Sequence, residues 1–256
     1  MGLKHVLEES LTYVDDLVDR ERIEILLGRL AEDNCHVVVA GSFSSGKSTL
    51  INALIGKKLL PSRNTPTTSV PAWIRRGDDI AHVRCQTSTD IDFDIRREDE
   101  REQLLSVLDG RNMPGQCIRV DIEVDSKDIP RRLMLVDVPG LDSLVAGHDS
   151  AQEWASLYAD VVLWLMDAGK PLTARDLDAL LKYQKQCRQI VFVLTQIDKI
   201  DESEESVETV AGAMRTVIIK TLGMHDPEIF PVSARDYLKG LDAGSASLQE
   251  GSGIEA

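Results

Sequence analysis

The stretch HVVVAGSFSSGKSTLINALIG, residues 36–56, decides the fold of this chain. It opens with β-branched residues typical of a buried strand and closes with an apolar pattern typical of a helix. The turn between them, GSFSSGKS at 41–48, fits the pattern G-x-x-x-x-G-K-S in the strand–turn–helix context that this pattern requires. The stretch therefore predicts a loop whose backbone amides surround phosphate groups.

The residue types of this loop suit a polyanion. Gly41 and Gly46 let the main chain approach phosphates closely, and the following helix adds the positive end of its dipole. Lys47 supplies a cation for the outer phosphates of a nucleoside triphosphate, and the Ser48 hydroxyl is a ligand for Mg²⁺. This pattern alone does not distinguish ATP from GTP. The nucleotide-binding residues expected here are Gly41, Ser42, Phe43, Ser44, Ser45, Gly46, Lys47, Ser48 and Thr49.

Two later segments suit a guanine nucleotide. In LVDVPG, Asp137 ends a buried strand, so we expect it to hold the water shell of Mg²⁺ and the Gly140 amide to contact the terminal phosphate. In VLTQID, Asp198 follows another buried strand. A carboxylate accepts hydrogen bonds from the ring N–H and the amino group of guanine, whereas adenine presents an acceptor instead of that N–H. The alternative is that Asp198 caps a helix.

A further motif, PVSAR at 231–235, follows the last predicted strand. We expect the main-chain amides of Ser233 and Ala234 to meet the guanine carbonyl. In chain order, the phosphate loop and these later motifs favour GTP over ATP. The residues predicted to bind the base are Thr195, Gln196, Asp198, Ser233, Ala234 and Arg235.

Strand-like and helix-like segments alternate along the chain, which predicts an α/β fold with a mostly parallel sheet flanked by helices. Thr173 and Asp176 are spaced like a capping pair at the start of one helix. The predicted strands are 36–41, 80–85, 91–95, 117–124, 131–140, 159–168, 189–198 and 228–235. The predicted helices are 47–56, 97–110, 173–186 and 203–222.

These patterns divide the chain into three parts. Residues 1–33 repeat apolar side chains at helical spacing, which predicts an amphipathic helical segment. That segment either packs on its own domain or docks on a partner segment. Residues 34–240 form the nucleotide-binding domain. Residues 241–256 are small and polar, which predicts a flexible linker or tail.

Composition excludes several other functions. The 256 residues carry a net charge of −14, which argues against a general nucleic-acid-binding face. The longest apolar runs are too short to cross a bilayer, and the first residues lack a basic-then-apolar signal region. The cysteines, at positions 35, 85, 117 and 187, lack metal-ligand spacing and indicate reduced thiols in a cytoplasmic protein.

Over residues 35–240 the sequence resembles the dynamin-like large GTPases, especially the bacterial dynamin-like proteins and more distantly the mitofusins. The resemblance is carried by GSFSSGKSTLINALIG, LLPSRNTPTTSVP, DVPGLDS and TQID. It implies a P-loop NTPase fold with an extended dynamin-type GTPase domain. In this family the proline-flanked TPTT is the first switch loop, whose threonine binds Mg²⁺ and positions water. The match favours Thr68 for that role, with Thr67 and Thr65 as alternatives.

Two positions depart from the pattern of small GTPases. Leu141 follows Gly140, where many small GTPases have a glutamine that orients water, and leucine cannot hydrogen-bond water. Dynamin-like enzymes also lack that glutamine, so Leu141 agrees with the resemblance. They use a phosphate-loop serine, here Ser44, with K⁺ or Na⁺, in a site completed by dimerisation. Gln196 stands where lysine is usual, and we expect it to weaken guanine binding without abolishing it.

The resemblance implies GTP hydrolysis with Mg²⁺, with Ser44, Lys47, Thr68 and Gly140 as the catalytic residues. The metal-binding residues are Ser48, Thr68 and Asp137. It also implies a homodimer through the nucleotide face and the motor of a membrane-remodelling system with a stalk or partner polypeptide. That system would be cytoplasmic, contact the inner membrane face only indirectly and bind no nucleic acid. The alternatives are a nucleotide-dependent interaction switch with negligible hydrolysis and an Era-like ribosome-associated GTPase.

Overall fold

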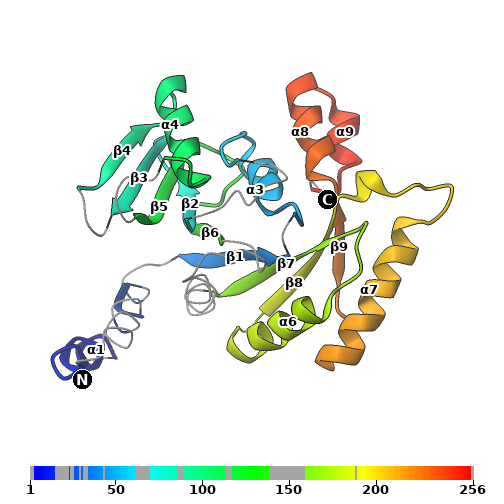
Figure 1. Cartoon of the computed structure of the whole chain (residues 1–256), viewed down its shortest axis with the longest axis horizontal. Coiled ribbons are helices and arrows are strands. Elements are labelled where there is room, and N and C mark those ends of the chain that lie inside the picture. The colour runs from blue at the N-terminus through cyan, green and yellow to red at the C-terminus, as the bar shows by residue number, and fades with distance from the viewer. Residues whose placement is uncertain are drawn as a thin grey trace.

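The structure of the chain is a computed structural model that describes residues 3–14, 23, 26–28, 30, 34–42, 44–61, 70–85, 89–112, 117–138, 159–187 and 189–254 (Figure 1). Within these residues, nine strands form one sheet in the order β4-β3-β5-β2-β6-β1-β7-β8-β9. The strands are β1 (Cys35–Gly41), β2 (Ala72–Arg76), β3 (Ile80–Cys85), β4 (Ile91–Asp94), β5 (Cys117–Val124), β6 (Leu133–Asp137), β7 (Val161–Asp167), β8 (Gln189–Thr195) and β9 (Ile229–Val232).

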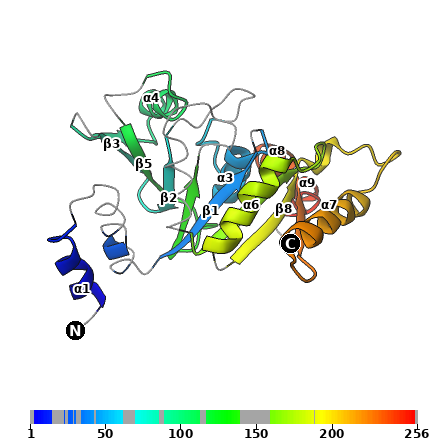
Figure 2. The same ribbon diagram turned by 60° about the horizontal axis from the view of Figure 1, so that its bottom comes forward.

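Most helices of the described part flank this sheet, whereas α1 (Leu3–Ser10) lies apart from it near the N-terminus (Figures 1 and 2). The other helices are α3 (Lys47–Ile55), α4 (Glu98–Leu108), α6 (Ala174–Gln186), α7 (Val207–Leu222), α8 (Ala234–Ala243) and α9 (Ala246–Glu250), with a short 3₁₀ helix, η1 (Ile197–Lys199). The α/β class predicted from the sequence is confirmed. The capping pair is also present, because Thr173 and Asp176 form a reciprocal capping box at the start of α6.

The sheet has a parallel half and a mixed half. Strands β6, β1, β7, β8 and β9 pair in parallel, so their carboxyl ends meet at one edge of the sheet. On the other side β3 is antiparallel to β4 and β5, and β2 joins the halves by pairing antiparallel to β6. The sequence did not predict β2. Its five residues, AWIRR, follow three prolines closely and have no clear alternation of apolar and polar residues.

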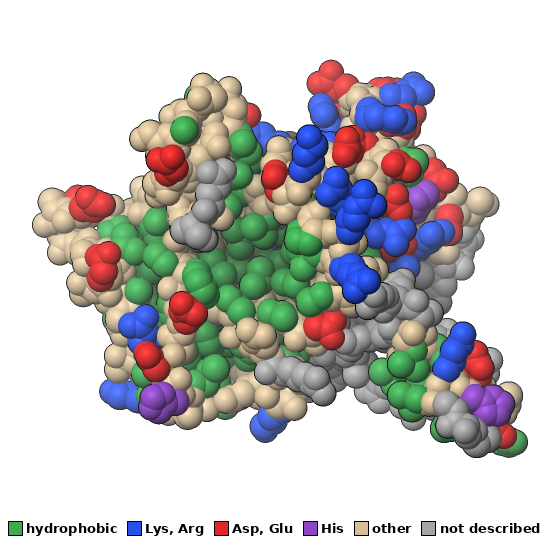
Figure 3. Space-filling model, turned by 180° about the vertical axis from the view of Figure 1, so that it is seen from behind, with side chains coloured by type: hydrophobic (Ala, Val, Ile, Leu, Met, Phe, Trp, Pro, Cys, Tyr) green, Lys and Arg blue, Asp and Glu red, His purple; other side chains and the backbone are tan. Residues whose placement is uncertain are grey.

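Two apolar cores lie on the two faces of the sheet. One contains Ile51 and Ile55 of α3 together with residues of α8, and the other contains Trp164, Phe192 and residues of α6 and α7. Figure 2 shows α6 crossing in front of the parallel strands, and Figure 1 shows α3 and α8 on the other side. From behind, apolar side chains gather in the middle of the face (Figure 3). These cores fix the strand ends that carry the predicted site.

The C-terminal residues differ from the predicted linker. Helix α8 continues to Ala243, and α9 follows after a turn at Gly244. Ser252 is fully buried, and its carbonyl accepts a hydrogen bond from the Ser233 amide at 2.8 Å. A Cβ at Gly240 would lie 2.8 Å from the Gln249 side chain, so glycine permits the close approach of α8 and α9. The small residues of this segment allow close packing of its helices. From composition alone, the same residues predicted a flexible linker.

The described part of the N-terminal segment contains α1, which buries none of its side chains. Leu3 and Val6 are exposed on it. In the described part of the chain, the helices are too short or too polar for a membrane span. Whether the segment acts as a separate unit, and where the nucleotide-binding domain begins and ends, remain predictions from the sequence.

Candidate nucleotide-binding site

The phosphate loop begins where β1 ends. Gly41 has φ 146°, and a Cβ there would lie 2.6 Å from the carbonyl oxygen of Leu165 on β7. Gly46 has φ 89° and leads directly into α3. Both backbone conformations favour glycine. The loop can therefore turn tightly between strand and helix, and it leads into the N-terminus of α3, where the helix dipole attracts anions.

Lys47 is the first residue of α3 and is buried. Its ammonium donates hydrogen bonds to the carbonyl oxygens of Gly41 at 3.0 Å and Ser42 at 2.8 Å. These contacts hold the cation against the loop that the sequence predicts to bind phosphate. A flexible lysine in this place can exchange carbonyl partners for phosphate oxygens without a change in backbone.

Two of the three predicted metal ligands, Ser48 and Asp137, lie side by side. The Ser48 hydroxyl donates to Asp137 Oδ2 at 3.2 Å, and both residues are buried. Their elements bring them together because Asp137 ends β6, which pairs in parallel with β1. A hydroxyl and a carboxylate are hard oxygen donors of the kind that Mg²⁺ prefers. The two residues therefore fit a magnesium site, with Asp137 also suited to bind the ion's water shell.

The TQID segment contacts the phosphate loop directly. The Thr195 hydroxyl bonds the carbonyl oxygens of Ser45 at 2.7 Å and Met166 at 3.0 Å. The next side chain, Gln196, donates from Nε2 to the Ser44 carbonyl oxygen at 3.0 Å. Ser44 and Gln196 both have φ 62°, a left-handed conformation that is uncommon outside glycine. Thr195 and Gln196 thus hold two neighbouring carbonyls of the phosphate loop, although about 150 positions separate this pair from the loop in the chain.

Asp198 has a partner on each carboxylate oxygen. The Ser233 hydroxyl donates to Oδ1 at 2.9 Å, and the Arg235 guanidinium donates to Oδ2 at 3.3 Å. Both contacts come from the PVSAR segment, so the structure brings the predicted base-binding residues together. The Ser233 amide donates to the Ser252 carbonyl oxygen at 2.8 Å, and its expected contact with the guanine carbonyl stays a prediction. Ala234 opens α8, where first-turn amides have no intrahelical partner.

Several predicted residues lie outside the part of the chain that the structure describes: Phe43, Thr65, Thr67, Thr68, Gly140 and Leu141. Their roles stay predictions. Among the others, Ser45 is buried in the loop and Thr49 is half-buried in α3.

Two residues contact the site although the sequence did not predict them there. Asp176, already engaged in the capping box of α6, accepts a hydrogen bond from the Ser42 hydroxyl. Lys199 contacts the side-chain oxygen of Gln196. The capping spacing did mark Asp176 as structural, but its link to the loop crosses 134 positions and leaves no local signal. Lys199 stands three residues after Gln196, a spacing that signals contact only once the 3₁₀ turn is known.

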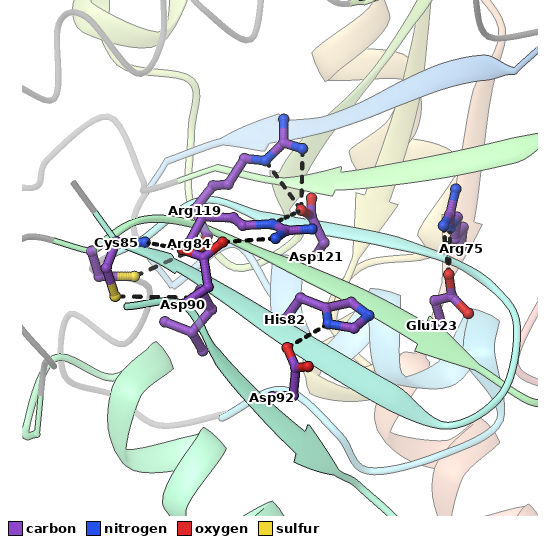
Figure 4. A network of polar contacts seen from close by, with 11 residues as sticks. Arg75, His82, Arg84, Cys85, Asp90, Asp92, Arg119, Asp121 and Glu123 are labelled. Carbon is purple, nitrogen blue, oxygen red and sulfur yellow. Dashed lines mark hydrogen bonds and ion pairs between the residues drawn. The ribbon is translucent and has the colours of Figure 1, made fainter. Parts of the chain in front are cut away.

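A second polar cluster lies on β3, β4 and β5, away from this edge (Figure 4). Arg84 bonds Asp90 at 2.8 Å and Asp121 at 3.1 Å, and Arg119 also bonds Asp121. The hydrogen bond from Arg84, followed by that from the Cys85 amide, lowers the pKa of Asp90. Opposite charges are paired throughout the cluster, so it serves the exposed face of the strands and is not a candidate site.

The sequence profile of the Dynamin family matches residues 37–197. The chain belongs to the dynamin family. The matched residues run from β1 to the first residue of η1, and they therefore include the loop, Asp137 and Gln196. This dynamin-family GTPase domain is a P-loop fold, and the match favours it over the Era-like alternative.

Relatives of this dynamin-family domain come from several organisms. The chain is 27% identical over 223 residues to Dynamin-like protein 2 of Campylobacter jejuni, covering 84% of this chain and 34% of that protein. It is 26% identical over 242 residues to the probable transmembrane GTPase FZO-like, chloroplastic, of Arabidopsis thaliana, covering 92% of this chain and 23% of that protein. The chain thus spans at most about a third of either relative.

A solved structure of an oligomerised bacterial dynamin pair has the same fold. It superimposes with a TM-score of 0.67 at 18% identity, covering 98% of this chain and 48% of that chain. At this identity the likeness concerns the fold alone.

Proposed function

We propose that this domain binds GTP with Mg²⁺ and hydrolyses it to GDP and phosphate. The observation that supports the proposal best is the convergence at one sheet edge of Lys47, the Ser48–Asp137 pair and Asp198. Phosphate, metal and base would each have a matching partner there. Water would attack the γ-phosphorus, the bond to the β–γ bridging oxygen would break, and the proton of the water would leave to solvent or phosphate.

Lys47 would shift its ammonium from the loop carbonyls to the outer phosphates, and Ser48 and Asp137 would hold the metal. Mg²⁺ would supply neutralisation of charge on the phosphate oxygens. Thr68 would complete the metal site and orient water, and the Gly140 amide would contact the γ-phosphate. Ser44 would bind K⁺ or Na⁺ or the bridging oxygen. These steps accelerate hydrolysis by positioning and charge stabilisation.

Guanine preference would come from Asp198. Ser233 and Arg235 hold its carboxylate in place, which supports its use as a fixed acceptor. A carboxylate retains free lone pairs after one hydrogen bond on each oxygen, so it can still accept from the ring N–H and amino group of guanine. Adenine would present a lone pair instead of that N–H and leave the site unpaired.

We further propose that hydrolysis is stimulated when two copies dimerise through the nucleotide face. Leu141 in place of a water-orienting glutamine motivates this step, because the single copy then lacks one catalytic group. The oligomerised bacterial dynamin pair, described as sensing and tethering membranes, supports a role beside a membrane together with a partner polypeptide. A stalk and a cytoplasmic location are part of the same proposal.

The test is phosphate release measured over a wide range of protein concentration, in potassium and in potassium-free buffer. We expect turnover per molecule to rise with concentration and to be higher in potassium. Lys47→Ala is the inactive control. Turnover that stays flat in both buffers would contradict stimulation by dimerisation, and release at the rate of the control would contradict hydrolysis itself.

A further inference from the structure

Lys199 reaches Gln196 through the geometry of η1. The amide of Lys199 donates to the Gln196 carbonyl oxygen at 3.0 Å, which closes one 3₁₀ turn. In such a turn the side chains at positions i and i+3 lie above one another. The Lys199 ammonium accordingly donates to Oε1 of Gln196. Backbone and side chain thus join the same two residues.

The nitrogen of the same side-chain amide binds the phosphate loop. Its Nε2 donates to the Ser44 carbonyl oxygen at 3.0 Å. A side-chain amide can turn over and present its oxygen instead, and an oxygen facing the Ser44 carbonyl would be repelled. A cation on Oε1 removes that choice, because it binds the oxygen and leaves the NH₂ group toward the loop.

The backbone of Gln196 also needs this support. Its φ of 62° and ψ of 33° are left-handed, a conformation that is unfavourable for a residue other than glycine. Such residues persist where several contacts fix them together. Here the fixing contacts are the hydrogen bond to Ser44 and the two bonds from Lys199.

We propose that Lys199 is a positioning residue for the nucleotide base. It orients the Gln196 amide, which packs beside the base and joins that side of the site to the phosphate loop. The proposal rests on the proposed function, because it assumes that this edge binds a guanine nucleotide. It also accounts for Gln196 in place of the usual lysine. Lys199, one 3₁₀ turn later, supplies the positive charge that glutamine lacks.

The first experiment compares Lys199→Ala with the unaltered chain by calorimetric titration of GDP and a non-hydrolysable GTP analogue in Mg²⁺. We expect both ligands to bind about three- to tenfold more weakly, the range that follows from losing one hydrogen bond. The loss should be equal for the two ligands, because the base is common to both. The melting temperature of the nucleotide-free variant is measured alongside to show that it is folded.

Two matched variants serve as controls. Lys199→Arg keeps a cation at the same place. Its loss of affinity, on a logarithmic scale, should be at most half of the loss caused by Lys199→Ala. Lys220→Ala removes another exposed lysine, in the last turn of α7, and should leave affinity unchanged.

The decisive arm repeats the substitution in a Gln196→Lys background. There the new ammonium can reach Ser44 itself and is repelled by Lys199, so Lys199→Ala should no longer weaken binding. Equal losses in both backgrounds, or no loss in the unaltered background, would overturn the proposal. Failure of the unaltered chain to bind GDP at all would instead contradict the proposed function, so the two failures are distinguishable.

Discussion

Asp198 illustrates how single residues set the chemistry of this site. Its carboxylate is held on both oxygens by side chains from the PVSAR segment, Ser233 at 2.9 Å and Arg235 at 3.3 Å. A helix cap, the alternative considered from the sequence, would accept from backbone amides of its own helix. Instead, Ser233 and Arg235, which stand 35 and 37 positions later in the chain, hold the carboxylate. A carboxylate held in this way is suited to accept hydrogen bonds from a ligand.

Replacing this carboxylate should change which base is preferred. Asp198→Asn presents one donor and one acceptor, which no longer match the two donors of guanine but match the N–H and C2 carbonyl of xanthine. We expect GDP affinity to fall by about a hundredfold and xanthosine diphosphate affinity to rise, in line with known rejection of mispaired polar ligands. Competition calorimetry measures both. Asp201→Asn, at an exposed aspartate bonded to Ser203, is the control. Unchanged preference would show that Asp198 does not read the base.

The thiol of Cys117 should react unusually slowly. Burial, with a further contribution from Cys85, raises its pKa from the ordinary 9.0 to about 11. Because the thiolate is the reactive form, a pKa two units higher lowers the reactive fraction at pH 8 by about a hundredfold. Alkylation followed by mass spectrometry should show Cys117 labelling rise steeply between pH 9 and 11 in the folded protein. In denatured protein the same cysteine should already react near pH 9. Equal labelling rates in the folded and denatured states would contradict the raised pKa of Cys117.

At the scale of elements, the sequence predicted those helices, strands and turns that are determined by residues close together in the chain. The strand–loop–helix of β1 and α3 was predicted because β-branched residues, two glycines and Lys47 follow one another directly. The capping box of α6 needs only Thr173 and Asp176 at their spacing. Strand β2 was missed because its five residues lack alternation, and the α8–α9 pair was missed because close packing at Gly240 looks like flexibility in composition.

Two glycines should respond oppositely to alanine. Gly41→Ala places a Cβ 2.6 Å from the Leu165 carbonyl at a φ of 146°, so we expect a loss of about 3 kcal/mol in the free energy of unfolding. Gly212 lies inside α7, and a Cβ there would meet nothing within 4 Å, so Gly212→Ala should stabilise by about 0.5 to 1 kcal/mol. Urea unfolding gives both values. Similar stability of the two variants would contradict the tight turn at Gly41.

At the scale of the whole molecule, the site is assembled by the parallel half of the sheet. The carboxyl ends of β1, β6 and β8 meet at one edge, which brings Lys47, Asp137 and the TQID segment together. The sequence predicted which motifs take part, because each has its own local pattern. It could not predict that Thr195 and Gln196 hold the loop carbonyls of Ser45 and Ser44, since those contacts depend on the order of strands.

The measurement that tests the account most directly is calorimetric titration of the folded chain with GTP, GDP and ATP in the presence of Mg²⁺. We predict saturable heat with GTP and GDP, at least a hundredfold weaker binding of ATP, on the order expected when a polar base site is mispaired, and no detectable binding by Lys47→Ala. Lys182→Ala, at an exposed lysine of α6, should bind like the unaltered chain. Absence of heat with both guanine nucleotides, or equal competition by ATP, would contradict the central claim.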